Sequence, residues 1–129
     1  MLAILEFYLT DPWSAFPLLL ALLIGHALCD FPLQGEFLAK GKNWHLLKNL
    51  QDPSRPPQIW FVCMACHCLI HAGSVWVVTG SFLMAITELV LHWCIDIAKC
   101  RGMITFNQDQ SLHVLCKVAY VALCYFKFV

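Results

Sequence analysis

Residues 82–98 read FLMAITELVLHWCIDIA, an apolar run interrupted by Glu88, His92 and Asp96. His92 and Asp96 are four residues apart, a spacing that places both side chains on one face of a helix. Because the rest of the run is apolar, the face that carries these two groups needs polar partners on other helices. The stretch therefore predicts one member of a helical bundle whose polar side chains point inward.

Three other stretches repeat this spacing of histidine and aspartate pairs. The pairs are His26 and Asp30, His67 and His71, and Asp109 and His113. Five of the six histidines fall in the four pairs, which is not the distribution expected of incidental surface histidines. Four helices that turn the pairs toward one axis would build a metal site inside the bundle. The alternative is that each pair only makes hydrogen bonds between helices.

The composition predicts that the bundle lies in a membrane. The chain is 60% hydrophobic and 12% charged, with a mean hydropathy of +0.71, whereas a soluble domain is typically about 25% charged. Its 129 residues allow four spans of roughly 20 residues and short loops. A formal net charge of zero and the lack of a basic stripe exclude nucleic acid as a partner. We therefore expect a single transmembrane domain, residues 1–129.

Hydropathy and turn residues predict an all-α fold with a bundle of four transmembrane helices. The expected spans are residues 12–31, 58–79, 82–98 and 109–128, preceded by an interfacial segment at residues 1–10. The polar stretch from Gln34 to Pro57 is expected to be the main loop. Seven of the eight cysteines lie in the apolar runs, where cysteine behaves as a small apolar residue rather than as part of a disulfide framework.

Basic residues predict how the bundle is oriented. The loop after the first span contains four lysines or arginines and the loop after the third contains two, whereas the turn after the second contains none. The positive-inside rule then makes both basic loops cytoplasmic and both termini extracytoplasmic. Asp30, Asp96 and Asp109 come at the cytoplasmic ends of their spans, with the histidine of each pair one helical turn, roughly 6 Å, deeper. The site should therefore open toward the cytoplasmic headgroups.

Charged groups inside the spans need compensation. A carboxylate at the centre of a membrane helix costs about 2.5 to 3.5 kcal/mol on insertion scales. Glu88 and Lys117 are expected at similar depth, so the sequence predicts that they pair. The three paired aspartates have histidines beside them and no basic partner apart from Lys99 at the rim. Protonation, lysine partners or bound cations would neutralise these carboxylates.

The predicted metal ligands combine imidazoles with carboxylates. They are His26, Asp30, His67, His71, His92, Asp96, Asp109 and His113. Such a shell suits Zn²⁺, Mn²⁺ or Fe²⁺ better than Mg²⁺ or Ca²⁺, which favour oxygen ligands alone. Gln34 and Gln110 are either hydrogen-bonding partners of the ligands or ordinary polar residues at helix ends. His45, in the polar loop, is expected to be solvated.

The combination of motifs resembles a known family. The motifs are His26-x-x-x-Asp30-Phe31-x-x-Gln34, His67-x-x-x-His71, His92-x-x-x-Asp96-x-x-Lys99 and Asp109-Gln110-x-x-His113. From Gly25 to about His113 the chain is similar to small polytopic membrane proteins of bacteria and their phages that are classed as a domain of unknown function. This resemblance implies a location in the bacterial inner membrane. More remotely, the chain resembles inner-membrane proteins described as metal-dependent hydrolases. The loop at residues 44–57, with its prolines, departs from the family pattern, so its role stays open.

Two functions are compatible with these observations. The first is an intramembrane metal-dependent hydrolase that acts on a lipid phosphoester at the cytoplasmic headgroup level. Its catalytic residues would be Asp96, Asp109 and His113, and Lys40 and Lys99 at the rim would hold the phosphate. The second is a non-enzymatic protein, such as an oligomeric pore, an ion pathway or an inhibitor of a host membrane process, with a structural metal or a hydrogen-bonded polar core. Membrane lipid is a partner in the first, and self-association fits both.

Overall fold

The computed structural model describes residues 12–50, 56 and 58–126, and this part of the chain contains helices and no β-strand. The helices are the 3-10 turn Pro12–Ser14, α1 (Ala15–Asp30), α2 (Gly35–Gly41), α3 (Trp44–Leu50), α4 (Ile59–Thr79), α5 (Phe82–Cys100) and α6 (Phe106–Tyr125). The all-α prediction is thereby confirmed. The interfacial segment expected at residues 1–10 lies outside the described residues.

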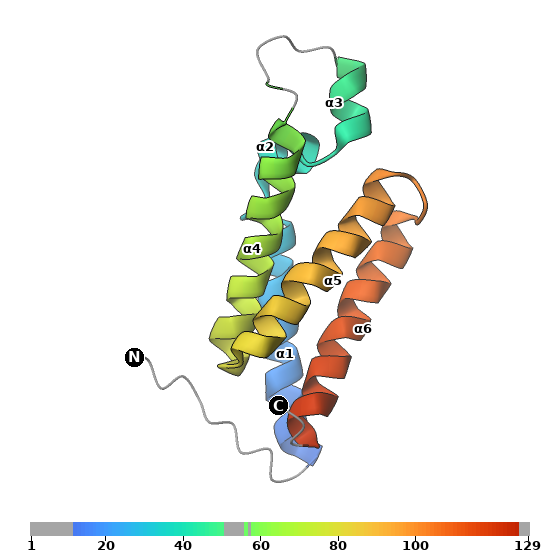
Figure 1. Cartoon of the computed structure of the whole chain (residues 1–129). Coiled ribbons are helices and arrows are strands. Elements are labelled where there is room, and N and C mark those ends of the chain that lie inside the picture. Colours follow the sequence, from blue (N-terminus) through green and yellow to red (C-terminus); the bar gives the residue numbers. More distant parts are fainter. Residues whose placement is uncertain (1–11, 51–55, 57, 127–129) are drawn as a thin grey trace.

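Four long helices, α1, α4, α5 and α6, form the bundle (Figure 1). α4 packs against both α1 and α5, and α6 completes the ring by packing against the same two helices. Their bounds follow the four expected spans closely, except that α6 begins three residues before Asp109. Asp109 therefore lies in the first turn of α6, where the helix dipole favours a carboxylate.

Local sequence explains why α4 and α5 are neighbouring antiparallel helices. Gly80 ends α4 in the left-handed conformation at φ 70°, which glycine adopts without steric cost. Ser81 then caps α5, because its side-chain oxygen accepts a hydrogen bond from the backbone N–H of Met84 at 3.3 Å. A connection of two residues leaves the second helix no alternative to packing back against the first.

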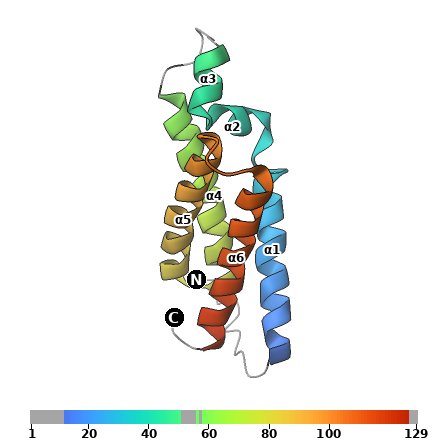
Figure 2. The same ribbon diagram turned by 90° about the vertical axis from the view of Figure 1, so that its right-hand side faces the viewer.

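The stretch expected to be one long loop, Gln34 to Pro57, contains two further helices. The side chains of Glu36 and Lys40 form an ion pair at 2.5 Å across one turn of α2. α1 and α2 are bent by 82° relative to one another, so α2 lies across the end of the bundle, where it packs against α4 (Figure 2). α3 follows after two residues. The loop prediction was therefore wrong for residues 35–41 and 44–50, where polar side chains concealed short helices.

The helices differ in how well their composition suits a membrane. Among the described residues, α4 alone is long and apolar enough by itself to span a bilayer, and α1 together with α2 passes the same test as a bent pair. α1 has only 16 residues, about 24 Å of helix. α5 carries Glu88, Asp96 and Lys99 within its 19 residues. Four separate spans are thus not evident, because α1 is too short by itself and the polar groups at the centre of the bundle lower the hydropathy of α5 and α6.

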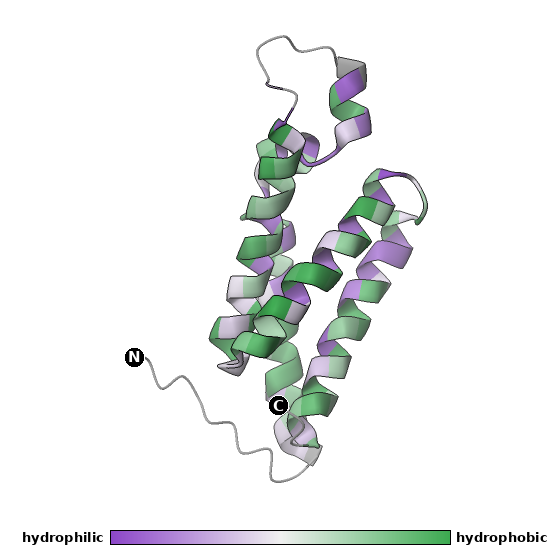
Figure 3. Ribbon diagram, viewed as in Figure 1, coloured by the Kyte–Doolittle hydropathy of each residue, from purple (hydrophilic) through white to green (hydrophobic). Residues whose placement is uncertain are grey.

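The apolar core occupies the end of the bundle away from α2. It consists of Leu18, Leu22, Val75, Met84, Tyr120 and Val121. Toward the α2 end, buried histidines and charged residues replace apolar ones in the interior. Figure 3 shows hydrophobic ribbon over much of α4 and α5, with hydrophilic segments on α3 and in the first turns of α6. The interior next to α2 is therefore polar, and the predicted ligands lie there.

Candidate metal centre

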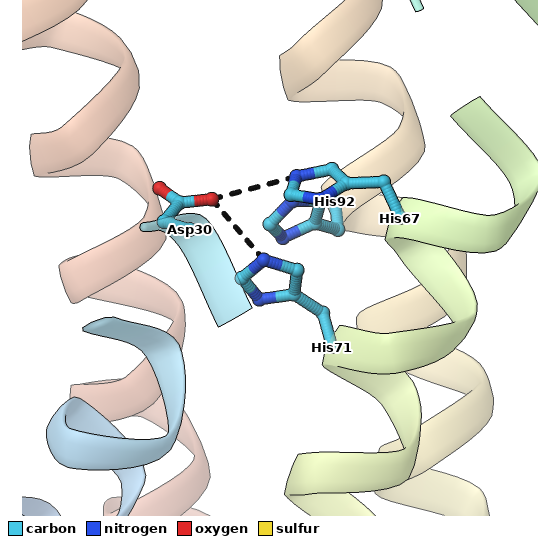
Figure 4. A group of neighbouring side chains, drawn as sticks. All are labelled: Asp30, His67, His71 and His92. Atoms are coloured by element: carbon cyan, nitrogen blue, oxygen red, sulfur yellow. Dashed lines mark hydrogen bonds and ion pairs between the residues drawn. The ribbon is translucent and has the colours of Figure 1, made fainter. Parts of the chain in front are cut away.

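One group of buried ligands joins three helices. Asp30 comes from the last turn of α1, His67 and His71 from successive turns of α4, and His92 from α5 (Figure 4). Each offers one ligand atom, and the four atoms lie within 4.8 Å of one another. Asp30 Oδ1 is 3.1 Å from His71 Nε2 and 3.4 Å from His67 Nε2. The Nε2 atoms of His67 and His92 are 3.1 Å apart.

A second group shares His92 with the first. His92, Asp96 and His113 also offer ligand atoms within 4.8 Å of one another. The two oxygens of Asp96 face different ways: Oδ2 is 3.3 Å from His67 Nε2, and Oδ1 is 3.9 Å from His113 Nε2. Asp96 thus connects the two groups through one carboxylate, as a bridging ligand would.

The remaining two predicted ligands adjoin these groups. His26 Nε2 lies 3.4 Å from Asp30 Oδ2, whereas His67 and His71 approach Oδ1 of the same carboxylate. Asp109 Oδ1 lies 3.5 Å from His113 Nε2. The structure therefore brings all eight predicted ligands into one continuous cluster, whose members are each less than a tenth exposed.

Several ligand atoms lack a hydrogen bond within the described residues. They include His26 Nε2, His113 Nε2 and Asp109 Oδ1, all buried and close to other members of the cluster. Leaving a buried polar atom unsatisfied costs roughly 1 to 3 kcal/mol. A cation would satisfy lone pairs on all three atoms, so the donor set fits a metal.

Three lysines pair with carboxylates around the cluster: Lys42 with Asp96, Lys99 with Asp109 and Lys117 with Glu88. Lys42 Nζ donates to Asp96 Oδ2 at 2.5 Å, and Lys99 Nζ lies 3.0 Å from Asp109 Oδ2. Lys99 follows the expected span, which ends at Ala98. Burial alone would lower the pKa of Lys99, but the hydrogen bond and charge of Asp109 outweigh burial and hold that pKa above its ordinary value. The ammonium therefore stays charged beside the carboxylate.

Asp30 differs from the other buried carboxylates because no lysine or arginine of the described residues pairs with it. Its neighbours are the three histidines named above and Gln110, whose Nε2 donates to Asp30 Oδ2 at 2.8 Å. Including Glu88, four buried carboxylates therefore face three ammonium groups. With neutral imidazoles the cluster retains one uncompensated negative charge, which favours a cation.

Glu88 orients His92. Its Oε1 lies 3.2 Å from His92 Nδ1, which leaves His92 Nε2 facing His67. Lys117 Nζ donates to the same oxygen at 2.5 Å, and the Tyr120 hydroxyl donates to Oε2 at 2.9 Å. The structure thus contains the Glu88–Lys117 pair that the sequence predicts. A carboxylate on the far nitrogen of a ligating histidine is the usual support of such ligands.

The structure decides between the alternatives left for Gln34 and Gln110 and places Lys40 and His45. Gln110 contacts the carboxylates of Asp30 and Asp109 and so supports the ligands. Gln34 Nε2 donates to the backbone oxygen of Asp30 at 3.0 Å, an ordinary helix-end contact. Lys40 pairs with Glu36 on the exposed surface of α2 and not with the cluster, and His45 is exposed as expected.

Lys42 is the functional residue that the sequence analysis missed. It ends α2, is 5% exposed, and reaches a carboxylate 54 positions further along the chain. Its position in a polar stretch hid it. The shortage of basic partners for three aspartates was the signal that could have revealed it.

The comparison with protein families agrees with the motifs. Residues 18–128 match the family described as "Protein of unknown function (DUF3307)". The chain belongs to this family. The DUF3307 match runs from α1 to the end of α6 and includes every residue of the cluster. No curated protein and no solved structure matches the chain.

Proposed function

We propose that this DUF3307 protein is a multi-pass membrane hydrolase that uses one or two divalent ions to cleave a phosphoester at the cytoplasmic headgroup level. One observation carries the proposal: the surroundings of His67 Nε2. Three ligand atoms lie around this nitrogen, Asp30 Oδ1 at 3.4 Å, His92 Nε2 at 3.1 Å and Asp96 Oδ2 at 3.3 Å. A single imidazole nitrogen has either one proton or one lone pair, so hydrogen bonding alone cannot satisfy all three contacts.

A metal ion accounts for these separations. Four donors at tetrahedral positions about 2.0 to 2.1 Å from Zn²⁺ lie about 3.3 to 3.4 Å from one another. Three of the separations within the first ligand group, at 3.1 to 3.4 Å, are close to this spacing, and all four ligand atoms lie within 4.8 Å of one another. Asp30, His67, His71 and His92 would hold the first ion. His113 and Asp109, joined to the first group through Asp96, would hold a second.

The outward surface supports the membrane location. Along α1 the side chains of Leu20, Ile24 and Leu28 are at least half exposed, and Leu69 of α4 and Leu115 of α6 are exposed to a similar degree. Buried charges combined with exposed leucines reverse the distribution in a water-soluble bundle. Such a surface is stable against lipid, and the lysines and arginine at the α2 end favour the cytoplasmic side.

The chemistry follows from the donor set. A divalent ion held by these ligands would lower the pKa of a bound water and polarise a phosphoryl oxygen. His113 Nε2 has no hydrogen-bonding partner within the described residues and lies 3.5 Å from Asp109 Oδ1. Its lone pair would either ligate the second ion or, if only the first ion is bound, accept a proton. Lys99 and Lys42 place positive charge beside the cluster, where it would stabilise a phosphate.

Asp30→Asn is the sharpest test, because Asp30 is the one buried carboxylate of the described residues without a lysine partner. The same change at Asp96 or Asp109 would strand Lys42 or Lys99. Metal content and hydrolysis of a lipid phosphomonoester are measured on protein purified in mild detergent without chelator. The wild type should carry near-stoichiometric Zn²⁺, Mn²⁺ or Fe²⁺ and be active. Asp30→Asn should lose more than about 90% of both.

Glu36→Gln is the matched control, since it makes the same carboxylate-to-amide change on the exposed face of α2. It should retain metal and activity. A wild type without metal would overturn the proposal and identify the cluster as a hydrogen-bonded polar core in a non-enzymatic membrane protein. A metal-loaded wild type without activity on any lipid phosphoester would leave the metal with a structural role.

A further inference from the structure

A pocket of about 320 Å³ lies beside the metal centre, between α3, α4 and α5. Ligand sites in proteins begin at roughly this size. Lys42, His45 and Arg101 supply its basic groups, and none of the described residues that line it is acidic. A cavity with basic groups and no carboxylate in its wall is suited to an anion.

The rest of the wall is apolar and aromatic. Trp44 of α3 and Trp60 of α4 line the pocket with their ring centroids 6.3 Å apart, and Met64 and Ile97 complete the apolar side. Tryptophan is the residue typical of the membrane interface, where one side of a site is apolar and the other is wet. The pocket therefore combines an anion-binding side with a surface for hydrocarbon.

Lys42 belongs to both the pocket and the metal centre. Its side chain lines the pocket, is 5% exposed, and donates to Asp96 Oδ2 at 2.5 Å. Arg101, immediately after α5, is exposed and provides the second cation. A phosphate that enters between these two side chains would compete with Asp96 for Lys42, which would bring the anion next to a predicted metal ligand.

We propose that this pocket binds the phosphate of an anionic amphiphile, with Arg101 and Lys42 on the phosphate and Trp44 and Trp60 against its apolar part. The inference rests on the proposed function in one respect, that the bound anion is the substrate. Binding of the anion to the pocket does not require that it be hydrolysed. Guanidinium groups bind phosphate oxygens through two parallel hydrogen bonds, so Arg101 suits a phosphate group.

The test measures lipid binding to the full-length chain in detergent by native mass spectrometry. Phosphatidylglycerol and phosphatidylcholine with the same acyl chains are titrated separately. The wild type should bind phosphatidylglycerol at least about tenfold more tightly than phosphatidylcholine. Each basic residue near an anionic headgroup contributes about fivefold in affinity. Arg101→Gln should weaken that binding about fivefold.

Lys48→Gln is the matched control, because Lys48 is an exposed cation of α3 that does not line the pocket. It should bind both lipids as the wild type does. Equal affinity of the wild type for the two lipids would overturn the proposal, as would equal losses in Lys48→Gln and Arg101→Gln. Arg101 is exposed, so its substitution should not impair folding.

Competition with inorganic phosphate distinguishes a free phosphate compound from a lipid. Displacement of phosphatidylglycerol by phosphate at a similar concentration assigns the pocket to free phosphate compounds, and displacement only at far higher concentrations assigns it to lipid headgroups. Metal content is determined on the same samples. Lipid selectivity without metal contradicts the hydrolase alone, and metal without lipid selectivity contradicts the pocket alone.

Discussion

The two ends of the bundle hold the same four helices together by different interactions. At the end where α4 turns into α5, six apolar residues fill the interior. At the α2 end, imidazoles, carboxylates and ammonium groups also meet in the interior and form ion pairs and hydrogen bonds of defined geometry. Apolar packing tolerates many arrangements of similar volume. Buried charges tolerate few, so the polar end specifies which helices are neighbours.

Removing a lysine from the polar interior should have the largest effect on stability. Lys117→Met leaves Glu88 buried without its charged partner, and we expect the free energy of unfolding to fall by about 3 to 5 kcal/mol. The double variant Lys117→Met/Glu88→Gln should lose less than the sum of the single variants, because no unpaired charge remains. The free energy of unfolding in detergent is measured for the two single variants and the double variant. Losses that simply add would contradict the coupling between Lys117 and Glu88.

Removing metal should destabilise the polar end by a similar amount. An ion present at 100 to 1,000 times its dissociation constant stabilises the folded state by about 2.7 to 4.1 kcal/mol. Chelation should therefore lower the midpoint of thermal unfolding of the wild type. Asp30→Asn lacks one ligand of the first group and should bind the ion there weakly, so its midpoint should respond less than that of the wild type. A wild type that is insensitive to chelator would contradict the metal centre.

Substitutions at the apolar end should cost less stability. If the bundle lies in lipid as proposed, packing its helices together brings no hydrophobic gain, so Leu22→Ala loses packing contacts alone, and we expect a cost of about 1 to 2 kcal/mol. In a water-soluble core the same change costs about 2.7 to 5.0 kcal/mol. Leu20→Ala, at a side chain that is 60% exposed, serves as the control and should be nearly neutral. A loss for Leu22→Ala in the soluble range would count against the membrane location.

The smallest expected effect concerns two glycines. A Cβ atom on Gly41 would lie 2.5 Å from Cys63 Sγ and 3.2 Å from Cys63 Cβ, so Gly41→Ala must push α2 away from α4. We expect a loss of about 1 kcal/mol. A Cβ on Gly73, within α4, meets nothing within 4 Å, and Gly73→Ala should gain up to about 1 kcal/mol from helix propensity. Thermal unfolding should move the two variants in opposite directions.

The sequence predicted the four long helices and the cluster well, because both follow from periodicity. A spacing of four residues puts His92 and Asp96 on one face whatever the tertiary packing. The role of Lys42 depends on the bend between α1 and α2. Pro32 predicts that the first helix bends or ends there, but no local pattern gives the direction in which α2 then runs. The Glu36 and Lys40 pair was a helix signal within the presumed loop, and it also explains why Lys40 is not at the rim of the site.

The order in which the ligands occur along the chain has a consequence for biosynthesis. Asp30, His67 and His71 all precede the turn at Gly80, so a ribosome that has completed α4 has already made three of the four members of the first ligand group. α1 and α4 also contact one another directly. The first half of the nascent chain can therefore assemble around an ion before α5 and α6 emerge. Metal supply would then act on the yield of folded protein as well as on the occupancy of the proposed metal centre.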